Sequence, residues 1–182
     1  IYQQIEPFKN RMAGKLSGGM KQKLGLCCAL IHRPDVLFLD EPTTGVDVVS
    51  RREFWEMLSQ LKAQGITILV STPYMDEANL CDRIALNQKG EILSINAPAN
   101  MVTDFPKKLF AISAANNFQL LQDVRNFPGV ETCFAFGDAL HVTFKDTSDR
   151  QILTYLHSKG YTDAHMESIL PSIEDCFIHL LS

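Results

Sequence analysis

One short segment of this 182-residue chain limits its fold more than any other. Residues 36–39 form a continuously apolar run, and two acids, Asp40 and Glu41, follow it directly. A strand that is apolar on both faces is typical of a parallel sheet covered by helices on both sides. A helical pattern at about 50–64 separates this run from a second one, rich in β-branched residues, at 66–70. Strands that alternate with helices in this way predict an α/β layered domain.

Composition narrows the class of protein. Hydrophobic residues make up 46% and charged residues 21%, as in a soluble globular protein. The formal net charge of −4 gives no general attraction to nucleic acid, so no nucleic-acid partner is expected. The five cysteines have irregular spacing, which gives no disulfide framework and fits a reducing cytoplasm. Cys27, Cys28 and Ile31 lie on one face of an apolar helical pattern, which predicts that the two thiols are buried and structural.

A second polar segment lies before the first apolar strand. Residues 16–22 read Leu-Ser-Gly-Gly-Met-Lys-Gln and directly precede a helical pattern at about 20–32. Two glycines allow a backbone to come close to a bulky anion, and Ser17 offers a hydroxyl. The start of the helix adds unpaired N–H groups, so the segment predicts a phosphate site. A simple capping turn would be the better interpretation if the segment stood alone.

The two acids give the segment a chemical context. Ligands of open α/β sheets bind at the carboxyl ends of the strands, where Asp40 and Glu41 stand. We expect Asp40 to hold Mg²⁺, directly or through water, and Glu41 to polarise an attacking water.

These segments together resemble a known family. The segment 16–22, the run Leu-Phe-Leu-Asp-Glu-Pro-Thr at 37–43 and Gly-Val-Asp at 45–47 are similar to the signature motif, Walker B strand and D-loop of ABC-transporter ATPases. Their order and spacing match the family across residues 1 to about 100. The resemblance implies the C-terminal part of a P-loop NTPase domain of ABC type.

The resemblance also implies roles for individual residues in a head-to-tail dimer that sandwiches two ATP molecules. Ser17, Gly18 and Gly19 would contact the γ-phosphate of ATP held by the partner domain, with Gln22 just behind them. In the chain's own site, Asp40 would serve Mg²⁺ and Glu41 would be the catalytic base. Asp47 would communicate across the dimer. The implied chemistry is phosphoryl transfer from ATP to water.

The sequence departs from the family in two places. No Gly-x-x-x-x-Gly-Lys-Ser/Thr phosphate loop (Walker A) occurs in the 182 residues, so we expect this segment not to act on ATP alone. Pro73 stands where the family usually carries a switch histidine, and proline offers neither a side-chain nor a backbone donor. We therefore hypothesise an asymmetric pair, a heterodimer or a tandem duplicate, in which the other site keeps its switch group.

The pattern changes near residues 98–106. From there strands and helices follow the order β-α-β-β-α-β plus a final helix, which predicts a small α+β domain of ferredoxin-like type over 106–182, after an ATP-binding part over 1–105. The boundary is expected close to Phe105. Residues 171–177 read Pro-Ser-Ile-Glu-Asp-Cys-Phe and resemble the closing stretch of many ABC-2-type exporter ATPases.

The predicted function is that of an ATP-binding, energy-coupling subunit of an ABC exporter. Its implied partners are a second nucleotide-binding domain and a separate membrane permease, at the cytoplasmic face of the cell membrane. Two alternatives stay open at this point. One is a non-transport ABC-class ATPase that acts on ribosomes or DNA, and the other is a non-catalytic interaction module.

Overall fold

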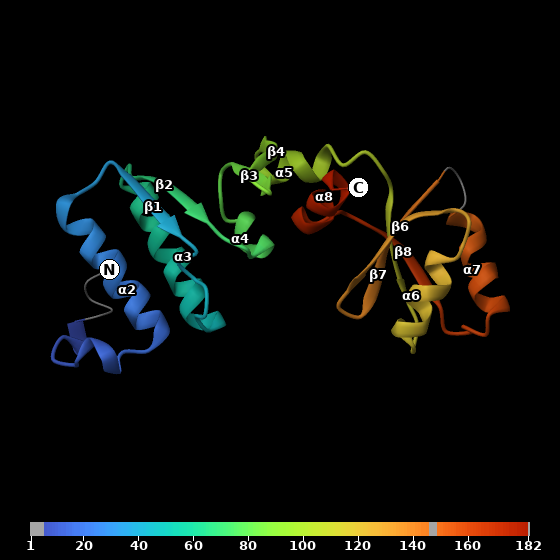
Figure 1. Cartoon of the computed structure of the whole chain (residues 1–182), viewed down its shortest axis with the longest axis horizontal. Helices are drawn as coiled ribbons and strands as arrows, with labels where there is room; N and C mark the ends of the chain where they lie inside the picture. The colour runs from blue at the N-terminus through green and yellow to red at the C-terminus, as the bar shows by residue number, and fades with distance from the viewer. Residues whose placement is uncertain (1–5, 146–148, 182) are drawn as a thin grey trace. The chain divides into compact units, whose positions relative to one another are not determined.

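The computed structural model describes residues 6–145 and 149–181 (Figure 1). The chain divides into two compact units, residues 1–80 and 81–182. The division places the hairpin that follows residue 80 in the second unit. A boundary of the ATP-binding fold near Phe105 stays a prediction.

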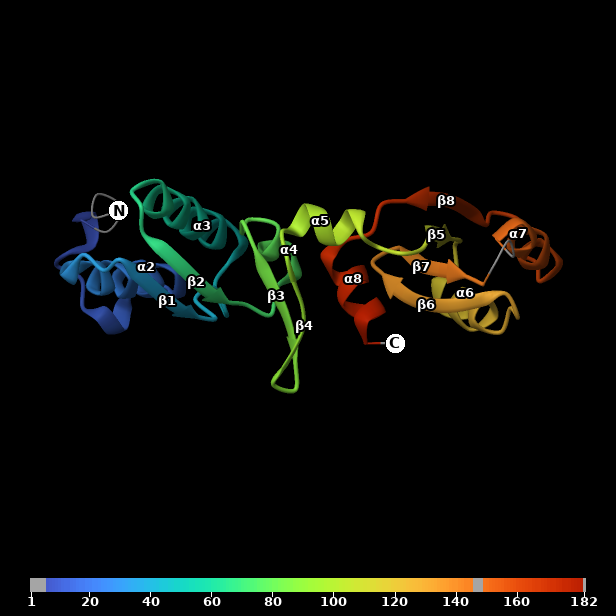
Figure 2. The same ribbon diagram turned by 90° about the horizontal axis from the view of Figure 1, so that it is seen from above.

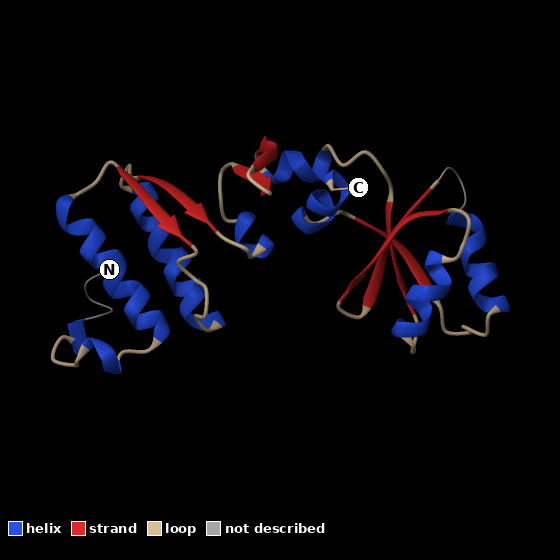
Figure 3. Cartoon of the chain, viewed as in Figure 1, coloured by secondary structure: helices blue, strands red, loops and turns tan. Residues whose placement is uncertain are grey.

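The first unit consists of short helices, two long helices and two strands (Figure 3). In chain order they are η1 (Glu6–Phe8), η2 (Ala13–Lys15), α2 (Gly18–Ala29), η3 (Leu30–His32), β1 (Val36–Asp40), α3 (Val48–Ala63), β2 (Thr67–Ser71) and α4 (Met75–Ala78). Both predicted strands and both long helices are therefore present, with ends shifted by at most three residues.

Strands β1 and β2 are parallel, and Leu37 pairs with Ile68 while Asp40 pairs with Ser71. Helices α2 and α3 cover one face of this pair, where Leu37 is buried (Figure 1). On the other face Phe38 is 73% exposed and Leu69 is 61% exposed. The prediction that the 36–39 strand is buried on both faces is thus wrong for the described residues, which cover only one face with helices.

Helix α2 also differs from its prediction. The sequence pattern places Cys27, Cys28 and Ile31 on one apolar face, but the structure buries Cys27 together with Leu26 and exposes Cys28 and Ile31. The helix turns its buried side toward α3, so adjacent apolar residues cannot all lie on it. The prediction of buried thiols is wrong for Cys28.

The second unit begins with an antiparallel hairpin and a short helix (Figure 2). The hairpin strands are β3 (Ile84–Gln88) and β4 (Glu91–Asn96), joined through Lys89 and Gly90, which both have positive φ. The elements that follow are α5 (Pro98–Thr103), β5 (Leu109–Ser113), α6 (Asn117–Arg125), β6 (Val130–Phe136), β7 (Ala139–Phe144), α7 (Asp149–Ser158), β8 (His165–Ile169) and α8 (Ile173–Leu180).

Strands β5 to β8 form one antiparallel sheet in the order β6-β7-β5-β8. With helices α6 and α7 between the strands in sequence, this is the ferredoxin-like arrangement. Side chains of the sheet and of both helices share one core, which includes Ile112, Leu120, Val142, Ile152 and Leu156. The predicted ferredoxin-like order is confirmed.

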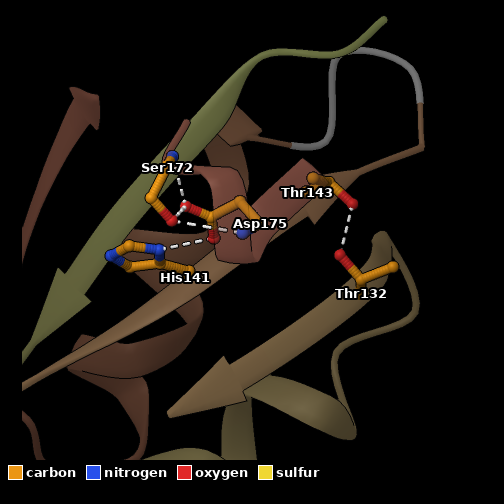
Figure 4. Close-up of polar contacts among 5 residues, drawn as sticks. All are labelled: Thr132, His141, Thr143, Ser172 and Asp175. Atoms are coloured by element: carbon orange, nitrogen blue, oxygen red, sulfur yellow. Dashed lines mark hydrogen bonds and ion pairs between the residues drawn. The ribbon is translucent and has the colours of Figure 1, made fainter. Parts of the chain in front are cut away.

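The last helix is fixed by polar contacts at its first turn (Figure 4). Ser172 and Asp175 form a reciprocal capping box, and the Asp175 carboxylate also lies 2.7 Å from Nδ1 of His141 on β7. The Cys176 thiol donates to the carbonyl of Met101 at the end of the buried side of α5. Both carboxylate oxygens of Asp175 are therefore bonded within the unit itself.

In the part of the chain that the structure describes, no helix combines the length and the hydropathy that a bilayer crossing requires.

Candidate functional site

The Ser-Gly-Gly segment stands at the start of α2. Ser17 is the N-cap residue in an extended conformation, and its Oγ accepts a hydrogen bond from the backbone N–H of Met20 at 3.3 Å. Gly18 and Gly19 form the first turn, in which helical N–H groups have no partner within the helix. The segment therefore presents donors and a partial positive charge, as an anion site requires.

The second glycine is required by packing. A Cβ on Gly19 would lie 2.5 Å from the Cβ of Ser50, and one on Gly18 would lie 3.4 Å from the carbonyl of Gly45. Helix α2 therefore begins directly against the start of α3. The glycines serve this close approach as well as any ligand.

Helix α3 begins at a second capped end. The carboxylate of Asp47 accepts a hydrogen bond from the backbone N–H of Ser50 at 2.9 Å. This bond lowers the pKa of Asp47 below its ordinary value. The signature and the D-loop segment thus meet at two adjacent helix starts, with Asp47 charged near neutral pH.

The two acids lie at the carboxyl end of β1. The Ser71 hydroxyl on the paired strand donates to Oδ1 of Asp40 at 2.5 Å. The backbone N–H of Glu41 donates to both the carbonyl and the hydroxyl of Ser71, each at 3.0 Å. Ser71 therefore fixes both acids, although no pattern in the sequence singles it out.

Glu41 itself adopts an uncommon backbone conformation. Its φ of +43° lies in the left-handed region, which a residue with a side chain adopts at a cost of about 1–3 kcal/mol. Its carboxylate accepts a hydrogen bond from the Thr44 hydroxyl at 3.1 Å. Such strain is frequent at catalytic positions.

The acids suit a magnesium ion that is shared with phosphates. Mg²⁺ in nucleotide sites is held by one or two carboxylates together with substrate phosphates and water. Asp40 is exposed and is oriented through one oxygen by Ser71, which leaves its second oxygen for such an ion. Among the described residues, no group of three His, Cys, Asp or Glu side chains gathers as a self-sufficient metal site. The residues present therefore fit an ion that arrives with its nucleotide.

The structure reveals a further cluster that the sequence reasoning missed. Thr43 and Thr72 both donate to Oε2 of Glu77, at 3.0 and 2.6 Å, and Glu77 is buried in α4. Pro73 lies exposed between Thr72 and Tyr74, directly after β2. No local sequence signal selects this cluster, because Glu77 and its partner Thr43 lie 34 residues apart along the chain.

The predicted residues fall into two neighbouring groups of the first unit. Gly18 and Gly19 approach the D-loop turn and the start of α3, whereas Asp40 and Glu41 meet Ser71. The turn between Glu41 and Asp47 connects the groups, with backbone bonds from Thr44 to Glu41 and from Val46 to Thr43. Gln22 lies in the second turn of α2 and is half-buried.

Several known ABC proteins are similar to this chain in sequence. The family model described as ABC transporter matches residues 2–44. The chain is 38% identical over 179 residues to the probable multidrug ABC transporter ATP-binding protein YbhF of Escherichia coli (strain K12), which covers 97% of this chain and 31% of the relative.

Over almost its whole length the chain is similar to ABC transporter ATP-binding proteins. It is also 32% identical over 186 residues to the Nod factor export ATP-binding protein I of Burkholderia thailandensis, which covers 98% of the chain and 58% of that relative. A nucleotide-free ATP-binding cassette from an ABC transporter superposes with a TM-score of 0.50 at 27% identity, over 52% of this chain and 38% of that one. The chain thus spans about a third to somewhat over half of the length of these curated relatives. The first unit has the P-loop NTPase type of fold that ABC cassettes share.

Proposed function

We propose that this chain supplies part of an ATP-binding, energy-coupling subunit of an ABC exporter. The observation that carries the proposal is the arrangement around the turn from Glu41 to Asp47. On one side of this turn stand the Walker B acids on their strand, and on the other stands the capped signature helix. The names of the relatives, one for multidrug transport and one for Nod factor export, favour export over a ribosomal or DNA-directed role.

The two groups of residues serve different ATP molecules in this proposal. Asp40 holds the Mg²⁺ of the nucleotide bound by the same domain, and Glu41 polarises the attacking water. Ser17, Gly18 and Gly19 donate to the γ-phosphate of a nucleotide bound by a second nucleotide-binding domain, with Gln22 behind them. Asp47, at the adjacent helix start, relays the state of one site to the other. ATP supplies the phosphoryl group that is transferred to water.

Pro73 makes the proposed pair unequal. It removes the switch side chain from the site built on Asp40 and Glu41, while the signature that serves the second site keeps its residues. We infer a heterodimer or a tandem duplicate. YbhF supports this inference, because a match of similar length covers 31% of it but 58% of the Nod factor protein, so YbhF is almost twice as long.

The proposed assembly also includes a separate membrane permease, with the ATP-binding subunit at the cytoplasmic face of the membrane. The ATP-binding part is proposed to run to residue 105, with the ferredoxin-like part over 106–182 as an accessory domain.

The test uses a longer protein that carries this segment together with a phosphate-binding loop, with its second ATP site inactivated so that turnover reports the site built on Asp40 and Glu41. Glu41→Gln should lower kcat for ATP by at least a hundredfold while nucleotide binding persists, because only the polarisation of water is lost. Glu56→Gln is the matched control, since this exposed glutamate pairs with Arg52 on the surface of α3. Hydrolysis at the wild-type rate by the Glu41 variant would overturn the proposal. For the 182-residue chain alone, calorimetry with Mg-ATP should give no strong binding. Micromolar affinity would contradict the expectation that this segment needs a phosphate-binding loop to hold ATP.

A further inference from the structure

We propose that Glu77 is a positioning residue of the ATP site. Its buried carboxylate ties the turn after the Walker B acids to the segment around Pro73 and to the start of α3. The link to ATP rests on the function proposed above, whereas the link among these segments rests on contacts alone.

The first set of contacts is made by one carboxylate oxygen of Glu77, which two threonines share. Oε2 of Glu77 accepts from the hydroxyl of Thr43 at 3.0 Å and from that of Thr72 at 2.6 Å. Thr43 lies two residues after Glu41, and Thr72 follows the last residue of β2. Glu77 therefore joins the loops that leave two neighbouring strands of the sheet.

The second set of contacts of Glu77 reaches helix α3. Oε1 of Glu77 lies 3.9 Å from Nη1 of Arg51, which is one turn beyond the Asp47 cap. The guanidinium of Arg51 also lies 4.5 Å from the ring centroid of Tyr74, in a cation–π arrangement. The start of α3, which follows the D-loop, is thereby connected to the residue after Pro73.

The segment around Pro73 is shaped by the same atoms. The Thr72 hydroxyl accepts from the backbone N–H of Tyr74 at 3.1 Å while it donates to Glu77. Pro73 itself has no backbone donor. The residues on its two sides therefore fix this segment, and both depend on Glu77.

Burial makes the tie specific. Glu77 is 3% exposed and Thr43 is 1% exposed. A buried carboxylate costs free energy unless donors surround it, so removal of one donor leaves a penalty that exceeds the modest gain from the intact bond. In this position the donors named above compensate the charge of the Glu77 carboxylate. The turn that carries Thr43 is held in place by the same contact.

This arrangement differs from simple anchoring of α4. An anchor needs only Thr72 and the short helix, whereas the contacts to Thr43 and Arg51 reach the two segments on which Glu41 and Asp47 stand. In this chain, where Pro73 occupies the switch position, the Glu77 side chain connects the end of β2 to the segments that carry Glu41 and Asp47.

The test of the tie uses the 182-residue chain and hydrogen exchange of the turn. Glu77→Ala and Thr43→Val should each speed exchange at the amides of Thr44 and Val46 by about tenfold or more, because the turn opens more often when its hydroxyl contact is lost. Thr43→Ser keeps the hydroxyl and should restore wild-type exchange, and Glu56→Gln should leave it unchanged. If Glu77→Ala prevents folding, the comparison of Thr43→Val with Thr43→Ser tests the proposal instead. Unchanged exchange in folded Thr43→Val would overturn the proposal.

The test of its consequence for ATP uses the longer protein. Thr43→Val should lower kcat by about tenfold and leave the KM for ATP within about threefold, since neither Thr43 nor Glu77 is placed to touch nucleotide. A loss that falls entirely in KM would overturn the positioning role. If the wild-type protein proves to hydrolyse no ATP while exchange responds as expected, the proposed function fails and the tie stands.

Discussion

The sheets of the two units differ in how they are covered. In the ferredoxin-like unit, Ile112 and Val142 of the sheet are fully buried against α6 and α7. In the first unit, Phe38 and Leu69 stand exposed on the face of β1 and β2 that faces away from α2 and α3. A buried side chain of this size contributes about 1.5–3 kcal/mol relative to an exposed one. The ferredoxin-like unit therefore has a complete core, and the described part of the first unit has half of one.

Polar side chains differ in the same way. In the second unit the capping box of Ser172 and Asp175 is closed by His141 of the same unit, so its hydrogen bonds serve the fold (Figure 4). In the first unit Ser17, Asp40 and Asp47 are held in place from one side and exposed on the other. These polar groups of the second unit thus stabilise its fold, whereas those of the first unit stay available to bind a ligand.

The largest effect is expected in the complete core. Leu120→Ala should destabilise the second unit by about 3 kcal/mol, because Leu120 is fully buried between α6 and the sheet. Urea unfolding followed by labelling of the buried Cys133 thiol would measure it. Phe118→Ala on the same helix is the control, since Phe118 is 79% exposed and should change stability by less than about 0.5 kcal/mol.

Trp55, the single tryptophan, reports separately on the first unit. Its fluorescence transition should keep its midpoint in Leu120→Ala. A common shift of the tryptophan and thiol transitions would show that the two cores unfold together and would remove the contrast between them.

The next effect concerns the contact between the two helix starts in the first unit. Gly19→Ala should destabilise it by about 1–3 kcal/mol, because the added methyl would lie 2.5 Å from the Cβ of Ser50. Gly25→Ala is a control of opposite sign, since its added methyl meets nothing within 4 Å and alanine favours a helix by about 1 kcal/mol over glycine. Equal shifts of the tryptophan transition in both variants would mean that α2 does not pack on α3 at Gly19.

A pH effect should distinguish the units next. Burial raises the pKa of Cys133 and of Cys176 in the second unit to about 11, against 9.0 for an ordinary thiol. A thiol with a raised pKa in the folded state adds stability that is complete below pH 9 and is lost as the pH rises toward 11, because the unfolded chain releases the proton first. The urea midpoint of the thiol-labelling transition should therefore fall between pH 8.5 and about 10.5. A double Cys→Ala variant, whose transition is followed by circular dichroism because it lacks the labelled thiol, should lose most of this slope, and an unchanged slope would assign the pH dependence to other groups.

How far the sequence predicts this molecule follows the same division. The ferredoxin-like order was predictable because each strand and helix is short, periodic and bounded by turn residues such as Gly137. The acids Asp40 and Glu41 were predictable because an apolar run places its end at the edge of a sheet. The six-residue helix α5 was missed because it is too short to show a helical period.

The remaining errors come from contacts that no local pattern contains. The face of α2 is set by its packing on α3, so Cys28 turned outward although its neighbours predicted burial. The pairing of Thr43 with Glu77 joins residues from separate elements, and the support of Asp40 by Ser71 depends on the register of two strands. Chemistry at strand ends could therefore be predicted from type and position, whereas the residues that hold it in place could not.

The smallest effect on stability is expected on the bare face of the first sheet. Phe38→Ser should change the free energy of unfolding by less than about 0.5 kcal/mol, because Phe38 is already 73% exposed. Leu37→Ala, at the neighbouring position on the covered face, should cost about 2–5 kcal/mol. The tryptophan transition of the two variants measures the difference between the faces directly.

Solution behaviour should respond in the opposite sense. An exposed apolar strand face promotes association, so Phe38→Ser should raise the concentration at which the chain stays monomeric in sedimentation, whereas Leu37→Ala should not. If Phe38→Ser instead cost as much stability as Leu37→Ala, the outer face would have to be covered in solution. The contrast between a complete and a half-covered core would then hold only for the first unit in isolation, because in solution another layer of structure would cover the outer face of β1 and β2.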